Sequence, residues 1–159
     1  MGSTAARVFP DTNVILGVVL IEQGLFEQAF AALYEGARRV VTSDLVRLEA
    51  MSRIWRHNRR GLGSTGRARL ISDATAVFET FPQRAEIDAA IIRDALDITN
   101  LVPGIHAMDA LHAATARSIG AEFLTFEATT KPLFFVPRLK VRSLLAGAPA
   151  QRVSHGSSP

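Results

Sequence analysis

Short apolar runs and amphipathic segments alternate along this chain. Uninterrupted apolar runs indicate buried strands, and segments with apolar residues every three or four positions indicate helices that cover a core. The predicted strands are residues 8–9, 40–42 and 123–126, with weaker candidates at 78–81 and 139–141. The predicted helices are residues 22–37, 43–55, 67–77, 87–98 and 107–119, and Ser43 is placed to cap the second of them.

The order of these elements, strand and helix in turn, predicts the α/β class. The strands are apolar throughout instead of alternating with polar residues, which is typical of a parallel sheet covered on both faces. In open sheets of this kind, ligands bind outside the carboxyl ends of the strands. Chemically active side chains are therefore expected just after the predicted strands.

Length and composition limit the organisation of the chain. With 159 residues, 48% of them hydrophobic, we expect a single domain over residues 1–145 and a C-terminal tail over 146–159. The absence of cysteine excludes disulfides and thiolate metal ligands. The longest apolar run, residues 14–21, is too short to span a membrane, and the first residues do not resemble a signal peptide. A cytoplasmic protein is therefore expected.

Basic residues gather in one segment. The formal net charge is only +3, but six arginines lie between Arg53 and Arg69. Arginine pairs with phosphate through two hydrogen bonds, so RNA is a candidate partner, and an acidic protein would also fit. The candidate RNA-binding residues are Arg53, Arg56, Arg59 and Arg60. The alternative interpretation is a solvated helix face followed by a loop.

Four acidic residues stand where a cleft at the carboxyl ends of the strands would use them. They are Asp11 after the first strand, Glu49 on the second helix, Asp109 at the start of the last helix, and Glu127 after the last strong strand. An acid such as Asp109, taken alone, is more often a helix cap. Together, the four carboxylates would repel one another, and a hard cation such as Mg²⁺ or Mn²⁺ would relieve this repulsion. The set therefore predicts a metal site.

Four segments of the chain resemble the successive motifs of PIN domains, and VapC-type toxins in particular. They are VFPDTNVIL at residues 8–16, TSDLVRLE at 42–49, MDALHAATA at 108–116 and LTFE at 124–127. The motifs occur in the family's order, and the resemblance extends from about residue 8 to about residue 141. One motif alone would be weak evidence, but the four together support the assignment.

The resemblance implies a three-layer α/β/α sandwich with about five mainly parallel strands. It also implies Mg²⁺- or Mn²⁺-dependent cleavage of RNA, inhibition by a cognate antitoxin, and a homodimer. By position, Asp11, Glu49 and Asp109 match the family's core acids, and Glu127 matches a fourth acid that is more often aspartate. The glutamate is the main departure, since its longer side chain leaves direct metal contact open.

The resemblance also suggests supporting roles. Thr12, Asn13 and Thr125 match polar neighbours that orient the acids or contact phosphate. His112 lies three residues after Asp109, near the same helix face, so a metal ligand or general base is conceivable. We favour a packing and hydrogen-bonding role for it.

Two other functions compete with the ribonuclease hypothesis. The first is a catalytically weak module that keeps the fold and binds RNA or an antitoxin, because fold resemblance does not guarantee activity. The second is a phosphatase with Asp11 as the covalent nucleophile. Such enzymes place a second acid two residues later, where this chain has Asn13, so the sequence argues against it.

Overall fold

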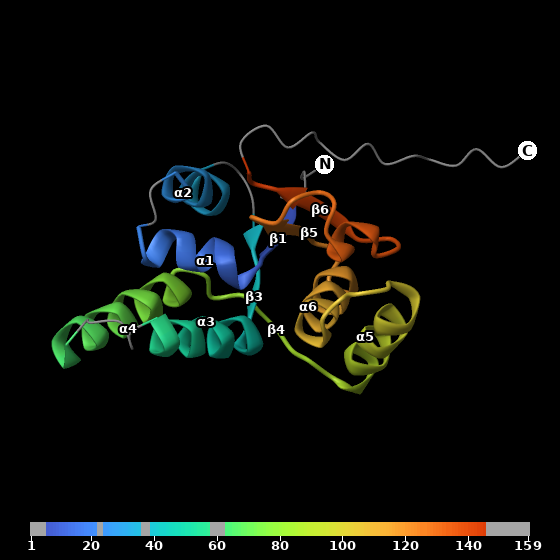
Figure 1. Ribbon diagram of the computed structural model, residues 1–159, viewed down its shortest axis with the longest axis horizontal. Coiled ribbons are helices and arrows are strands. Elements are labelled where there is room, and N and C mark those ends of the chain that lie inside the picture. Colours follow the sequence, from blue (N-terminus) through green and yellow to red (C-terminus); the bar gives the residue numbers. More distant parts are fainter. Residues whose placement is uncertain (1–5, 22–23, 36–38, 58–62, 146–159) are drawn as a thin grey trace, which may run out of the picture.

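The main sheet of the computed structural model has four parallel strands, in the order β2-β1-β5-β6 (Figure 1). The structure describes residues 6–21, 24–35, 39–57 and 63–145. The strands are β1 (Arg7–Pro10), β2 (Arg39–Val40), β5 (Glu122–Thr125) and β6 (Lys140–Ser143). A second parallel ladder pairs β3 (Thr42–Ser43) with β4 (Arg84–Ala85).

The two ladders are joined by one continuous stretch of chain, residues 39–43. The amide of Val41 donates to the carbonyl of Val8 in β1, and the amide of Thr42 donates to the carbonyl of Gln83 just before β4. After Val41 the chain therefore no longer pairs with β1 and pairs instead with β4. This explains why the strands form a set of four and a set of two.

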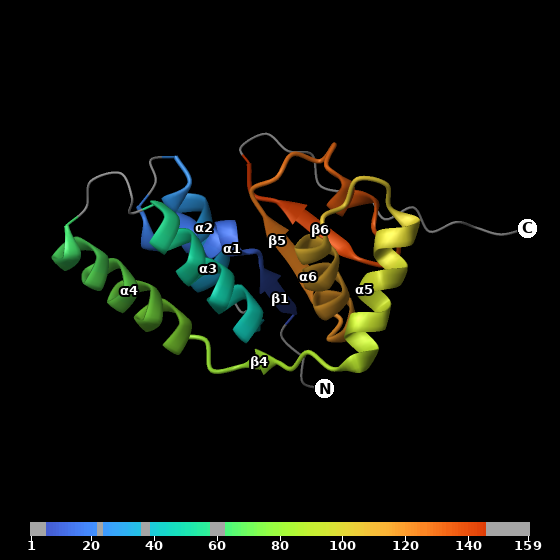
Figure 2. The same cartoon turned by 60° about the horizontal axis from the view of Figure 1, so that its bottom comes forward.

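Two groups of helices lie on either side of β1 (Figures 1 and 2). The sheet is therefore flanked by helices, and the predicted α/β class with a mainly parallel sheet is confirmed. One group consists of α1 (Thr12–Val19), α2 (Phe26–Tyr34), α3 (Asp44–His57) and α4 (Ser64–Glu79). The other consists of α5 (Ala89–Leu101) and α6 (Ala107–Ser118), and the short 3-10 helix η2 (Pro132–Phe135) contacts α6.

Side-chain caps fix where three helices begin. The carboxylate of Asp11 accepts from the amide of Thr12 at the start of α1, and that of Asp88 accepts from Ile91 at the start of α5. Ser43 accepts from the amide of Val46, as predicted for a cap of α3. Each bond satisfies an amide that lacks a partner within its helix.

Several predicted boundaries differ from the structure. Residues 78–81 are not a strand, because α4 continues through Glu79 and buries Phe78 completely in the core. Helix α1 was not predicted, since nearly every one of its residues is buried and no amphipathic pattern results. The predicted tail, residues 146–159, lies outside the described residues. Within the described residues, no helix combines the length and apolar character needed to cross a membrane.

Candidate metal centre

The register between β1 and β5 brings Asp11 beside Thr125. Phe9 pairs with Phe123 in the parallel ladder, and the amide of Asp11 donates to the carbonyl of Leu124 at 2.8 Å. Both side chains are buried at the carboxyl ends of these neighbouring strands. The Thr125 hydroxyl donates to Asp11 Oδ2 at 3.0 Å, while Oδ1 accepts from the amide of Thr12 at 2.7 Å.

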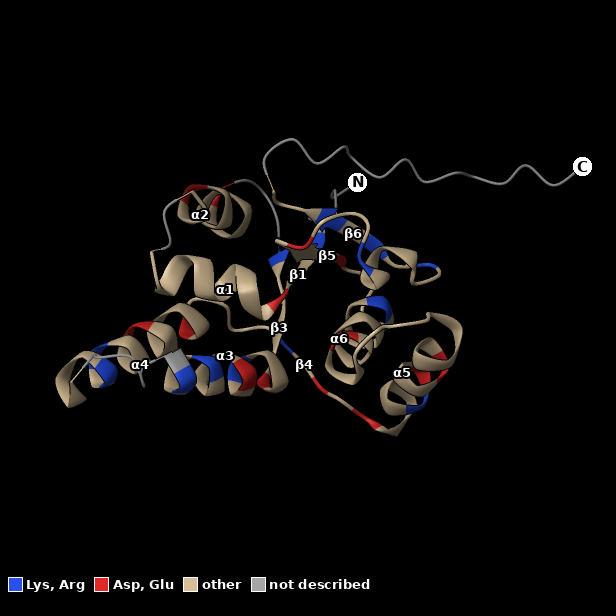
Figure 3. Ribbon diagram, in the orientation of Figure 1, with Lys and Arg blue, Asp and Glu red and all other residues tan. Residues whose placement is uncertain are grey.

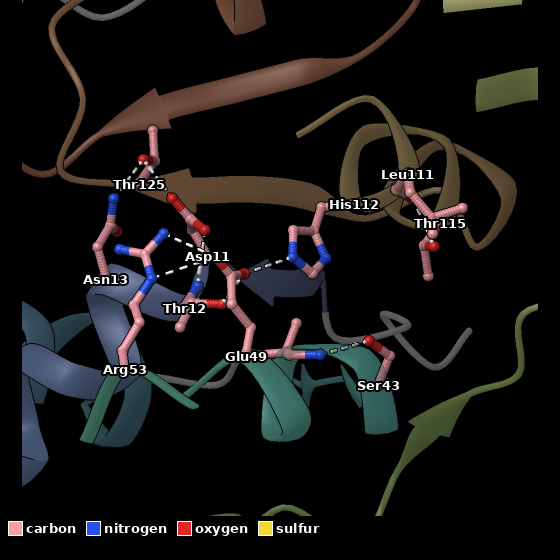
Figure 4. A network of polar contacts seen from close by, with 11 residues as sticks. Asp11, Thr12, Asn13, Ser43, Glu49, Arg53, Leu111, His112, Thr115 and Thr125 are labelled. Atoms are coloured by element: carbon pink, nitrogen blue, oxygen red, sulfur yellow. Dashed lines mark hydrogen bonds and ion pairs between the residues drawn. The ribbon is translucent and has the colours of Figure 1, made fainter. Parts of the chain in front are cut away.

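Glu49 reaches this place from α3 and is held by three donors (Figure 4). Its Oε2 accepts from the hydroxyl of Thr12 at 2.7 Å and lies 3.0 Å from Nε2 of His112. Its Oε1 accepts from Nε and Nη2 of Arg53 at 3.1 and 2.7 Å. Hydrogen bonding, first to His112 and then to Thr12 and Arg53, outweighs burial and lowers the pKa of Glu49 to about 2. Glu49 is therefore ionised at neutral pH.

Three of the side chains form a compact group. Asp11, Glu49 and His112 each offer one ligand atom, and these atoms all lie within 4.8 Å of one another. Burial raises the pKa of Asp11, although His112 and the hydrogen bond from Thr125 act in the opposite direction. The fold thus keeps a carboxylate in a poorly solvated place at an energetic cost.

Asp109 and Glu127 do not belong to this group but interact electrostatically with its members. Asp109 lies in the first turn of α6, and Glu127 follows β5. Burial raises the pKa of Asp109, and the charge of Glu49 raises it further. Burial also raises the pKa of Glu127, as do the charges of Asp109 and Asp11. All four predicted acids therefore interact electrostatically, and their mutual repulsion favours a bound cation.

His112 is held in the core. Its side chain is 1% exposed, its ring lies 6.2 Å from that of Phe9, and its Nδ1 has no hydrogen-bond partner among the described residues. A histidine that binds a metal through one nitrogen normally donates the other N–H to an acceptor. No such acceptor meets Nδ1, so the tautomer that donates from Nε2 to Glu49 fits better. The remaining candidate metal ligands are carboxylate oxygens, which Mg²⁺ and Mn²⁺ prefer.

The three predicted polar neighbours belong to the same network. Asn13 donates through Nδ2 to the Thr125 hydroxyl at 3.2 Å and accepts at Oδ1 from the amide of Phe126. The Thr125 hydroxyl oxygen also accepts from the amide of Glu127 at 3.2 Å. Thr125 therefore connects the backbone before Glu127 with the carboxylate of Asp11, and Thr12 connects α1 with Glu49.

The predicted arginines have different positions. Figure 3 shows basic residues along α3 and α4. Arg53 contacts the acids through Glu49, whereas Arg56 is exposed and donates to the backbone carbonyl of Ser52 at 3.4 Å. Arg59 and Arg60 lie outside the described residues. The pairing of Arg53 with Glu49 was not predicted, although their spacing of four residues on a helix is a signal for it.

Comparison with known proteins adds a family and a fold. The family model described as PIN domain matches residues 8–130 of the chain. No curated protein matches the chain by sequence.

Solved structures with a similar fold come from bacteria and an archaeon. A chain of VapBC2 from Rickettsia felis, bound to a DNA fragment from its promoter, is 13% identical with a TM-score of 0.64, covering 86% of this chain and 98% of its own. PAE2754 from Pyrobaculum aerophilum is 17% identical with a TM-score of 0.61, covering 88% and 92%. FitAcB from Neisseria gonorrhoeae is 21% identical with a TM-score of 0.59, covering 86% and 97%.

Proposed function

This chain belongs to the PIN-domain family, and from that premise we propose that it is a metal-dependent endoribonuclease that hydrolyses RNA phosphodiester bonds. The observation that carries the proposal is the convergence of Asp11 and Glu49, whose ligand atoms lie within 4.8 Å of each other, inside the field of Asp109 and Glu127. These acids come from four separate parts of the chain. Because these carboxylates lie close together, they repel one another, and a bound divalent cation would relieve this repulsion.

The proposed division of labour follows the contacts. Asp11, Glu49 and Asp109 would hold Mg²⁺ or Mn²⁺, with Glu127 in support. The bound ion would supply an activated water molecule near neutral pH and neutralise charge on the phosphate under attack. Thr125 holds Asp11 in place, and Thr12 holds Glu49, so both carboxylates are oriented before any ligand arrives.

We also propose that the protein is the toxin of a toxin–antitoxin pair, with a cognate antitoxin as its partner and a homodimer as its own assembly. The resemblance to VapC-type toxins supports this role, as does the similar fold of chains in the VapBC2 and FitAcB structures. Exposed Phe30 on α2 and Trp55 on α3 offer apolar surface for a partner helix. Light scattering after size-exclusion chromatography tests the assembly, and a strict monomer at high concentration contradicts the dimer.

The nuclease proposal is tested with total bacterial RNA and Mn²⁺, comparing the parent protein with Asp11→Asn and Asp88→Asn. Both variants change an aspartate that caps a helix, and asparagine caps equally well, so both should fold. Of these two aspartates, Asp11 belongs to the group formed with Glu49 and His112, and Asp88 does not. We expect cleavage by the parent and by Asp88→Asn, and none by Asp11→Asn.

Two outcomes would contradict this mechanism. Cleavage by Asp11→Asn at the parent's rate would show that the acidic group is not the reacting centre. A parent protein that leaves the RNA intact but binds it would support the competing hypothesis of a catalytically weak binding module. Circular dichroism of each variant checks that the helices are retained.

A further inference from the structure

The two oxygens of Glu49 have different surroundings. Oε2 accepts hydrogen bonds from Thr12 and His112, whereas Oε1 is bound by Arg53 alone among the described residues. An ionised carboxylate offers about four lone-pair sites, two on each oxygen. The two sites of each oxygen are therefore filled, those of Oε2 by the buried Thr12 and His112 and those of Oε1 by the partly exposed Arg53. Oε1 is the oxygen that Glu49 can offer to a cation, and in this structure the fork of Arg53 holds it.

Arg53 supplies positive charge to three of the four acids, Glu49, Asp109 and Glu127. Its side chain is 45% exposed, lies one turn after Glu49 on α3, and points toward Glu49 and Thr12 (Figure 4). Its charge also lowers the pKa of Asp109 and of Glu127, against the larger effect of burial. In the absence of a metal ion, Arg53 thus partly compensates the repulsion among the carboxylates.

A divalent cation and Arg53 cannot share this place. Both seek the lone pairs of Glu49 Oε1, and their like charges repel at short range. We propose that Arg53 is an exchangeable counter-ion: it pairs with Glu49 in the metal-free protein, and metal binding displaces it to a phosphate of the RNA substrate. This inference rests on the proposed function, because it needs both a bound cation and an RNA substrate.

The destination of the displaced side chain follows from its chemistry. A guanidinium group binds phosphate through two parallel hydrogen bonds and stays charged at any physiological pH. Being nearly half exposed, Arg53 can rotate away from Glu49 without opening the core. Among the described residues, Arg56, three residues later, donates to the backbone of its own helix and has no carboxylate partner. Arg56 is therefore a matched control on the same helix.

The first experiment measures Mn²⁺ binding by calorimetry for the parent, Arg53→Ala and Arg56→Ala. Removing Arg53 removes a competitor for Oε1, so we expect Arg53→Ala to bind Mn²⁺ roughly three- to tenfold more tightly, the range of a partly exposed ion pair and a nearby like charge. Arg56→Ala should bind Mn²⁺ as the parent does. Both changes favour the helix, so neither should unfold α3.

The second experiment measures binding of a fluorescent single-stranded RNA with phosphorothioate linkages, which keep the backbone charge and slow hydrolysis. A protein that loses one phosphate contact to a single strand shows a salt dependence shallower by about 0.7 in the slope of log affinity against log salt. We expect Arg53→Ala to show this loss in the presence of Mn²⁺ and no change of slope without it, because Arg53 reaches RNA only after the metal displaces it.

The outcomes separate this inference from the proposed function. If the parent binds Mn²⁺ and cleaves RNA but Arg53→Ala binds Mn²⁺ no more tightly, the counter-ion exchange is overturned and the nuclease proposal stands. An equal loss of slope with and without Mn²⁺ would also overturn the exchange. If the parent neither binds Mn²⁺ nor cleaves RNA, both proposals fail.

Discussion

His112 allows the most direct test of how the acidic group is built. Its Nε2 lies 3.0 Å from Glu49 Oε2, and this contact is the largest cause of the lowered pKa of Glu49. We predict that His112→Leu weakens Mn²⁺ binding strongly, whereas His112→Gln retains most of it. The glutamine amide can donate to Glu49 from a similar position, and leucine cannot.

The magnitude follows from the contact that is lost. A hydrogen bond to a charged group contributes about 1.5 to 3 kcal/mol. The Glu49 side chain is 16% exposed, so water can replace part of that bond, and we expect the lower end of the range. Loss of a residue that orients a metal ligand typically costs about 10- to 100-fold in affinity. Leucine fills the space next to Phe9, so a large cavity does not confuse the result.

Calorimetric titration with Mn²⁺, run on folded protein at neutral pH, measures the effect. The decisive comparison is between the two variants, since both lose the imidazole ring and only one loses the donor. If His112→Gln binds Mn²⁺ as weakly as His112→Leu, then the imidazole itself is needed. His112 would in that case be a ligand, and the assignment of an orienting role would be wrong.

Three further predictions concern stability. Arg117 on α6 donates two hydrogen bonds to the carboxylate of Asp94 on α5 and a third to the carbonyl of Pro137 at 2.8 Å. Arg117→Ala should therefore lower the free energy of unfolding, measured in urea, by about 1 kcal/mol and leave the affinity for Mn²⁺ unchanged. Above pH 4.5, the usual pKa of glutamate, the metal-free protein should lose stability as pH rises, because Asp11, Asp109 and Glu127 have raised pKa values and keep protons that the unfolded chain has released. The lowered pKa of Glu49 acts in another range, since the stability it contributes is lost only as pH falls from 4.5 to about 2. Equilibrium denaturation that shows stability rising with pH above 4.5 would contradict this. Mn²⁺ at 100 times its dissociation constant should add about 2.7 kcal/mol to the parent, seen as a higher melting temperature, and nothing to Asp11→Asn.

Much of the fold could be predicted from the sequence, because its signals are local. The apolar run before Asp11 and the one before Glu127 form buried strands, and Ser43 caps a helix as expected. The prediction failed where local signals mislead. Phe78 and Phe81 suggested a strand, but they are three residues apart, a spacing that a helix also gives, and Phe78 is buried at the end of α4.

The sequence indicated two members of the compact group, Asp11 and Glu49, and not the hydrogen bonds that hold them. Asp11 and Glu127 follow predicted strands and Asp109 opens a predicted helix, which indicated where the acids would meet. The hydrogen bonds between them depend on how distant elements pack: Thr12 and Glu49 are 37 residues apart, and His112 and Glu49 are 63 apart. No local pattern encodes these two long-range contacts, so the partner of His112 is identified only in three dimensions, whereas the four-residue spacing of Glu49 and Arg53 is a local signal.

The pairing of β1 with β5 has a consequence for synthesis. Asp11 is made near the beginning of translation, yet the hydroxyl that fixes its carboxylate belongs to a residue made 114 positions later. Until the ribosome has released the segment through Glu127, β1 lacks its neighbour β5, and Asp11 lacks the hydrogen bond from Thr125. The proposed metal centre is therefore not assembled in a nascent or prematurely terminated chain that lacks β5, and this delay follows from the order of the strands.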